Sequence, residues 1–186
     1  MLRIIADSTC DISKEDARKM GIQIVPISVR FGDEEFLDGV EITHEEFYTR
    51  LAECDELPKT SQPSPDTFMK VFNEAVADGD DVLGIFISSD LSGTYQSACL
   101  AALDVEEETG KKLYMVDSRS ASIGTALLIR EAVKLRDAGV NVYDIAAACT
   151  EMSKYIKLTA VVGSLKYLKI CLLYTSPSPR DGLLSR

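Results

Sequence analysis

Hydroxyl side chains gather in loops that directly follow short apolar runs of this sequence. Three such loops are Asp7-Ser8-Thr9, residues 88–94 and Asp117-Ser118, each after a run expected to be a strand. In open α/β sheets, ligands bind where loops leave the carboxyl ends of parallel strands. Hydroxyl groups are neutral hydrogen-bond donors, so these loops suit recognition of a small anion.

Ser92-Gly93-Thr94 is the most informative of these segments, because a helix is expected to begin there. Gly93 lets another group approach the backbone closely, and a helix start offers free N–H groups and a positive dipole end. The segment is therefore a candidate cradle for one anionic group, and simple N-capping by Ser92 is the alternative. Residues 88–94 contain no Lys or Arg, which favours a carboxylate over a multiply charged phosphate.

A second candidate is the segment Thr60-Ser61-Gln62-Pro63-Ser64-Pro65. Two prolines stiffen it, and its hydroxyl and amide groups are free to face a ligand. An ordinary linker followed by a helix cap explains the same residues, so both interpretations stay open.

Several kinds of site lack their usual signatures. The sequence has no GxxxxGK[ST] and no GxGxxG motif, which disfavours nucleotide cofactors. A serine esterase using Ser92 would need the only histidine, His44, within reach, and the chain has no GxSxG elbow. Asp7 and Asp117 follow strands as single carboxylates, which more often cap turns than bind metal. We expect no metal and no cofactor.

The composition points to a folded cytoplasmic protein. The 186 residues are 46% hydrophobic and carry a formal net charge of −10, which disfavours nucleic acid and anionic membranes as partners. No segment is apolar for long enough to span a bilayer. The five cysteines are scattered without a CxxC pair, which fits a reducing compartment.

The order of elements predicts an α/β fold with a mostly parallel sheet and helices on both faces. Helix starts are indicated by Ser13, by a capping box of Thr43 and Glu46, and by Ser64-Pro65. Predicted strands occupy residues 2–6, 22–31, 35–37, 82–87, 113–116 and 158–162. Predicted helices begin near residues 14, 44, 65, 94, 125 and 142.

Four ordered motifs resemble the DegV family over nearly all of residues 1–169. They are Ile4-Ile5-Ala6-Asp7-Ser8-Thr9-Cys10-Asp11 with Val25-Pro26-Ile27, Thr60-Ser61-Gln62-Pro63-Ser64-Pro65, Ser89-Asp90-Leu91-Ser92-Gly93-Thr94-Tyr95, and Val116-Asp117-Ser118 with Gly124. The resemblance implies a carrier that encloses one long-chain fatty acid between two domains. It is not catalytic by itself, and it presents the lipid to a separate fatty-acid kinase for acyl-phosphate formation.

Carried over by position, the resemblance implies that Thr60, Ser61, Ser92 and Gly93 bind the fatty-acid carboxylate. Further candidates from the hydroxyl-rich loops are Ser8, Thr94 and Ser118. The alternatives from other classes are a serine esterase that uses Ser92 and a generic α/β domain that binds small anions.

The expected domain organisation is an N-terminal α/β domain over residues 1–163 and the start of a second domain over residues 164–169. The family would continue there into a Gly-Gly-Arg segment, but this sequence departs from it. Residues 170–186 look like a non-native tail, so we expect most of the second domain to be missing. The resemblance implies that this domain carries a further carboxylate contact and one wall of the lipid tunnel.

Overall fold

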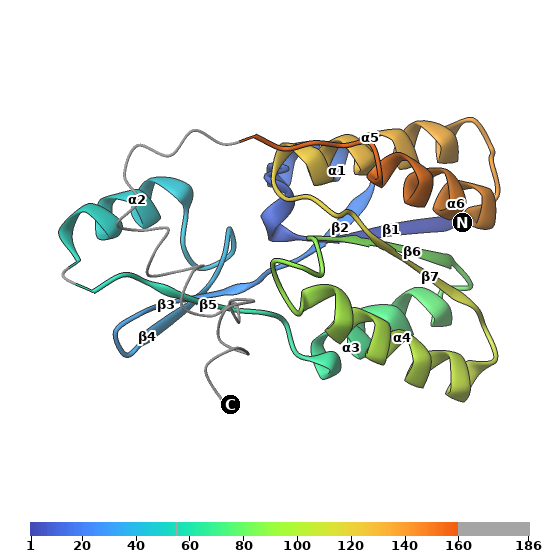
Figure 1. The fold of residues 1–186 in the computed structure, drawn as a ribbon. Coiled ribbons are helices and arrows are strands. Elements are labelled where there is room, and N and C mark those ends of the chain that lie inside the picture. The colour runs from blue at the N-terminus through green and yellow to red at the C-terminus, as the bar shows by residue number, and fades with distance from the viewer. Residues whose placement is uncertain (55, 160–186) are drawn as a thin grey trace, which may run out of the picture.

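The computed structural model describes residues 1–54 and 56–159, and its centre is a parallel sheet of four strands in the order β2-β1-β6-β7 (Figure 1). The strands are β1 (Leu2–Asp7), β2 (Ile22–Val25), β6 (Asp81–Phe86) and β7 (Leu113–Asp117). One face is covered by α1 (Lys14–Met20), α5 (Ile123–Asp137) and α6 (Val142–Ser153). The other is covered by α3 (Pro65–Ala77) and α4 (Thr94–Thr109). The predicted α/β class with helices on both faces is confirmed.

Each face of the sheet has its own apolar core, because neighbouring strand residues point to opposite sides. Ile4 and Ala6 pack with Leu128 on the α5 side, whereas Ile5 packs with Phe68 on the α3 side. All five side chains are fully buried or nearly so. Burial on both faces explains why the central strands read as continuous apolar runs rather than alternating ones.

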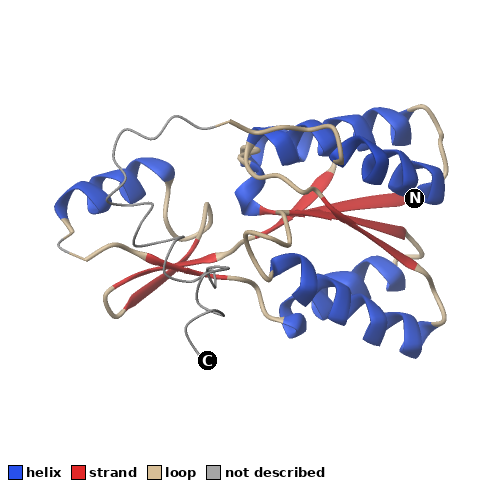
Figure 2. Cartoon of the chain, in the orientation of Figure 1, coloured by secondary structure: helices blue, strands red, loops and turns tan. Residues whose placement is uncertain are grey.

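A second, antiparallel sheet in the order β4-β3-β5 extends from the first (Figure 2). It consists of β3 (Ser28–Phe31), β4 (Glu34–Leu37) and β5 (Lys59–Ser61), and α2 (His44–Glu53) lies in the same part of the chain. The single strand predicted over residues 22–31 is wrong, because two strands in different sheets occupy it. Pro26 has no N–H to donate to a ladder, so pairing stops at Val25 and resumes at Ser28.

Most helix starts are where the sequence places them. The Ser13 hydroxyl accepts a hydrogen bond from Asp16 N at 3.0 Å, and Thr43 with Glu46 forms the predicted capping box. Ser64 caps α3 with Pro65 in its first turn, also as predicted. A 3-10 turn, η1 (Ser8–Cys10), separates β1 from α1.

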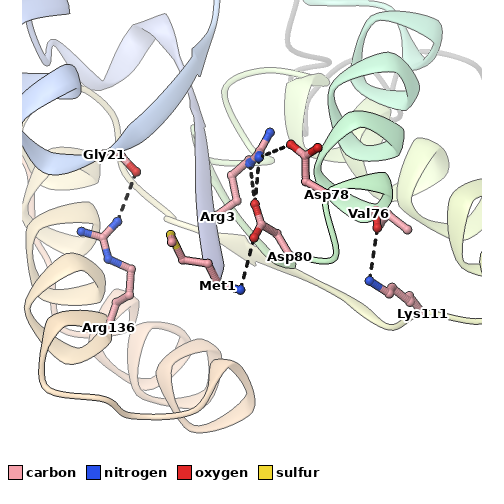
Figure 3. Close-up of polar contacts among 8 residues, drawn as sticks. All are labelled: Met1, Arg3, Gly21, Val76, Asp78, Asp80, Lys111 and Arg136. Carbon is pink, nitrogen blue, oxygen red and sulfur yellow. Dashed lines mark hydrogen bonds and ion pairs between the residues drawn. The ribbon is translucent and has the colours of Figure 1, made fainter.

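Ionic and polar contacts tie together the edge of the parallel sheet where β1 begins (Figure 3). The Arg3 guanidinium lies 2.8 Å from carboxylate oxygens of both Asp78 and Asp80, and the amino group of Met1 lies 3.2 Å from Asp80. The Arg136 guanidinium also donates to the carbonyl of Gly21 at 3.1 Å. These contacts stabilise the side of the sheet where the strands begin. The hydroxyl-rich loops lie at the opposite side, where the strands end.

Some predictions fall outside the described residues. The strand predicted over residues 158–162 has no regular structure at Leu158 and Thr159, and its remainder is not described. The proposed domain limits at residues 163 and 169 and the tail at 170–186 also lie outside. Among the described helices, none combines the length and the apolar character needed to cross a membrane.

Candidate functional site

The loops at the carboxyl ends of the parallel strands are joined by main-chain hydrogen bonds. Ser88 N donates to the carbonyl of Ser120 at 2.8 Å, and Ser118 N donates to the carbonyl of Phe86 at 3.0 Å. The hydroxyl-rich loops therefore lie close together, because they leave adjacent strands at one edge of the sheet.

The two aspartates at this edge act as acceptors for the turns around them. Asp7 accepts hydrogen bonds from Thr9 N and Ile87 N, both at 2.9 Å, and it contacts the Thr9 hydroxyl. Burial raises the pKa of Asp7, although the donors around it favour the ionised carboxylate. Asp117 accepts from the hydroxyl of Ser89 at 2.6 Å. Over residues 1–54 and 56–159, no cluster of three or more His, Cys, Asp or Glu side chains could hold a metal ion.

The start of α4 presents the predicted Ser92-Gly93-Thr94 segment. The hydroxyls of Ser92 and Thr94 lie 2.9 Å apart, and Thr94 N donates to Ser92 Oγ at 3.3 Å. Gly93 is the residue that precedes the helix and has no side chain to cap it, so the Ser92 hydroxyl is the side-chain acceptor at this helix start. Thr94 is fully buried, whereas Ser92 is partly exposed. Ser92 and the free N–H groups of this helix start are thus open to an anion.

The second predicted segment reaches this helix start through Gln62. Gln62 Nε2 donates to the hydroxyl of Ser97 at 3.0 Å, on the first turn of α4. A Cβ added to Gly93 would lie 2.9 Å from both Cδ and Nε2 of Gln62, and closer still to Oε1. The Gln62 amide therefore lies directly on Gly93, which brings the end of β5 against the start of α4. The role of Gln62 as the link between the two segments is a feature that sequence reasoning missed.

Thr60 and Ser61 lie on β5, the edge strand beside that contact. Ser61 pairs with Ser28 of β3, and Thr60 pairs with Val29. Both side chains are exposed, and their hydroxyl groups have no hydrogen-bond partner within the part of the chain that the structure describes. Their hydroxyls are therefore free to bind a ligand, although successive side chains of a strand point to opposite faces of the sheet.

The three further candidates differ in how far their hydroxyls are already engaged. Ser8 accepts a hydrogen bond from Ile27 N at 3.2 Å, and Thr94 bonds to Ser92. Ser118 is fully buried, and it donates to the carbonyl of Ser120 at 3.0 Å while accepting from Thr125. The Ser118 hydroxyl therefore stabilises its own loop.

An apolar pocket of about 570 Å³ lies between α1, β2 and the turn before α2. Its wall includes Ser8, Ile12, Ile24, Pro26 and Val40. The volume falls within the range of about 300–1,000 Å³ typical of small-molecule sites. Ser8 and Pro26 belong to one of the four motifs, but nothing in the sequence indicated that they share the wall of a pocket.

His44 lines that pocket at the first position of α2, where its side chain is exposed. The hydrogen bonds of the Ser92 hydroxyl run to Thr94, and no histidine in the described residues bonds to it. The arrangement gives Ser92 no base of the kind a serine esterase requires.

Comparison with known proteins agrees with the fold and the motifs. The family model described as "Uncharacterised protein, DegV family" matches residues 1–170. A DegV domain-containing protein of Clostridium perfringens is 38% identical over 167 residues, which are 90% of this chain and 59% of that protein. The chain thus spans little more than half the length of this relative.

Two solved structures extend the comparison. A stearic acid-binding protein from Eubacterium ventriosum is 35% identical with a TM-score of 0.80, covering 99% of this chain and 64% of that one. A fatty-acid-binding DegV family protein from Thermus thermophilus is 34% identical with a TM-score of 0.73, covering 83% and 54%. With the family match over residues 1–170 and the four motifs in their expected order, the chain belongs to the DegV family.

Proposed function

We propose that this protein binds one long-chain fatty acid and holds its carboxylate at the start of α4. The hydroxyls of Thr60, Ser61 and Ser92 and the backbone N–H of Gly93 are the donors. The observation that carries the proposal is the contact of Gln62 with Gly93 and Ser97, since it brings both predicted loops to one helix start. Neutral donors at the positive end of a helix suit a single negative charge.

The acyl chain supplies most of the affinity, because burying each methylene contributes about 0.8 kcal/mol. The apolar pocket beside α1 is lined by Ser8 but by none of the four proposed donors, so any part of the acyl chain that it takes would lie away from the carboxylate. Each charge-assisted hydrogen bond to the carboxylate adds about 1.5–3 kcal/mol. The fatty-acid-binding activity of the structural neighbours supports the same class of ligand.

We further propose that the protein is a carrier that presents the lipid to a separate kinase. Ser92 has no histidine partner in the described residues, so the site binds the carboxylate without attacking it. Thr60 and Ser61 are exposed, which leaves the carboxylate end of the ligand accessible from outside. An ATP-using partner could then phosphorylate the bound carboxylate.

Native mass spectrometry of the 186-residue chain purified from a bacterial host tests the binding step. A stoichiometric adduct with the mass of a fatty acid is the expected result, and Thr60→Val together with Ser61→Ala should weaken it. A folded chain that takes up no oleate at saturating concentration would contradict the proposal for this chain. Displacement of oleate by millimolar phosphate would favour a generic anion site, and Ser92-dependent cleavage of a chromogenic ester would favour an esterase.

A further inference from the structure

Gln62 makes a contact that neither the hydroxyl pattern nor the family description assigns. Its side chain leaves the end of β5 and reaches α4, where Nε2 donates to the Ser97 hydroxyl at 3.0 Å. Ser97 is 4% exposed, so this bond is anchored on a buried group. Gln62 lies directly after Ser61 in the chain, and Ser97 is on the first turn after Gly93.

The same contact explains why residue 93 has no side chain. Gly93 has φ −74°, which any residue can adopt, so backbone freedom is not the reason. A Cβ would collide with Oε1, Cδ and Nε2 of Gln62, the end of a flexible side chain, so a larger residue at this position would displace the amide from Gly93. The group that approaches the Gly93 backbone in this structure is therefore the Gln62 amide.

We propose that Gln62 is the positioning residue of the carboxylate site. It holds Thr60 and Ser61 at the start of α4, and Gly93 is small so that the Gln62 amide fits. This inference rests on the proposed fatty-acid function, since it names the residue that assembles that same site. Loss of the amide separates the donors on β5 from those on α4 while leaving each donor present.

The substitution Gln62→Glu separates a positioning role from a purely structural one. A carboxylate next to the start of α4 interacts favourably with the helix dipole, so the free energy of unfolding should be unchanged or raised. The same negative charge repels a fatty-acid carboxylate, so oleate affinity should fall by about tenfold or more. A residue with only a structural role would change affinity and stability in the same direction.

Gln96→Glu is the matched control, because Gln96 lies on the same first turn of α4 and is exposed. It adds the same charge to the same helix, but it leaves the contacts of Gln62 with Gly93 and Ser97 unchanged. We expect its oleate affinity to stay within about threefold of that of the unaltered chain. Equal losses for Gln62→Glu and Gln96→Glu would overturn the proposal.

A double-mutant cycle of Gln62→Ala and Gly93→Ala provides the second measurement, on the 186-residue chain. Gly93→Ala should reduce oleate affinity by about tenfold or more when Gln62 is present, and much less in the Gln62→Ala background. Equal losses in both backgrounds would show that the space at position 93 serves the ligand rather than the Gln62 amide, and would overturn the positioning role.

The same double-mutant cycle is then measured as free energies of unfolding in urea, without ligand. This measurement separates the inference from the proposed function, because it does not depend on oleate binding. If the unaltered chain binds no oleate, the proposed function fails, and non-additive unfolding free energies would still establish the Gln62–Gly93 contact. If the unaltered chain binds oleate and Gln62→Ala and Gln62→Glu bind it equally well, the function stands and the inference fails.

Discussion

Replacing Ser92 with alanine should weaken fatty-acid binding far more than it weakens the fold. The Ser92 hydroxyl contacts Thr94 Oγ1 at 2.9 Å and accepts from Thr94 N at 3.3 Å, so its removal leaves the buried Thr94 hydroxyl with one partner fewer. Such a loss at a helix start costs about 1 kcal/mol of stability, within a range of about 0.5–2. The loss of a charge-assisted bond to the ligand costs about 1.5–3 kcal/mol, which corresponds to roughly 10–150-fold in affinity.

Ser64→Ala is a closely matched control at the start of α3. The Ser64 hydroxyl lies 3.0 Å from Thr67 Oγ1 and accepts from Thr67 N at 3.2 Å, so it makes the same two kinds of contact as Ser92, with a threonine three rather than two residues on. Ser64 caps its helix in an exposed position and is absent from the proposed donor set. It should lose about as much stability as Ser92→Ala or less, and its affinity for oleate should not change.

Urea unfolding and isothermal titration with oleate, both at 25 °C, measure the two quantities separately. A loss of about 1 kcal/mol from a domain with about 5–15 kcal/mol of stability leaves nearly all molecules folded, so the measured affinity reports on the site. Unchanged oleate affinity in Ser92→Ala would refute the donor role of Ser92. Equal losses of affinity in Ser92→Ala and Ser64→Ala would show that the effect is global.

Three further predictions concern the scaffold. Gly84→Ala should cost about 1–3 kcal/mol of unfolding free energy, measured by urea titration, because the added Cβ would collide with the buried ring of Phe86. Burial opposes ionisation of Asp80, but its bonds to the amino terminus and Arg3 lower its pKa below 3.8. The stabilisation of the fold by the ionised carboxylate is therefore present at neutral pH and is lost as pH falls through the lowered pKa. Asp80→Asn should therefore cost about 0.5–1 kcal/mol at pH 7, and its unfolding free energy should converge with that of the unaltered chain in acid. Burial raises the pKa of the Cys149 thiol to about 11, so alkylation at pH 8, mapped by mass spectrometry, should be slow in the folded chain and fast in urea.

The parts of the fold that were predictable depend on neighbouring residues. Caps such as Ser13 and the Thr43–Glu46 box are local hydrogen-bonding patterns, and the structure contains both. The alternation of apolar runs with helices likewise predicted the parallel sheet, because burial on both faces shows directly in composition. The hydroxyl-rich loops follow from the same reasoning, since strand ends in such a sheet share one edge.

What the sequence did not indicate depends on contacts between distant residues. Gln62 and Ser97 are 35 positions apart, and nothing in the local pattern of either residue indicates that they meet. Residues 22–31 form a continuous β-prone run, and only the partners of each half show that it serves two sheets. Similarly, Ser118 has the same local pattern as the other loop serines, but its hydroxyl is buried and already bonded to Ser120 and Thr125.

The break at Pro26 is also what makes the proposed site possible. A single strand through residue 31 would keep the chain within the parallel sheet. Every donor would then have to come from a loop at the carboxyl ends of the parallel strands. Because pairing stops at Val25 and resumes at Ser28, β3 can carry β5 as its antiparallel neighbour, with Ser61 opposite Ser28. The end of β5 then reaches the start of α4, which packs on the parallel sheet, through the Gln62–Ser97 hydrogen bond. In the proposed site the donors would thus come from both parts of the chain, and we expect Gln62, whose side chain joins them, to fix their spacing.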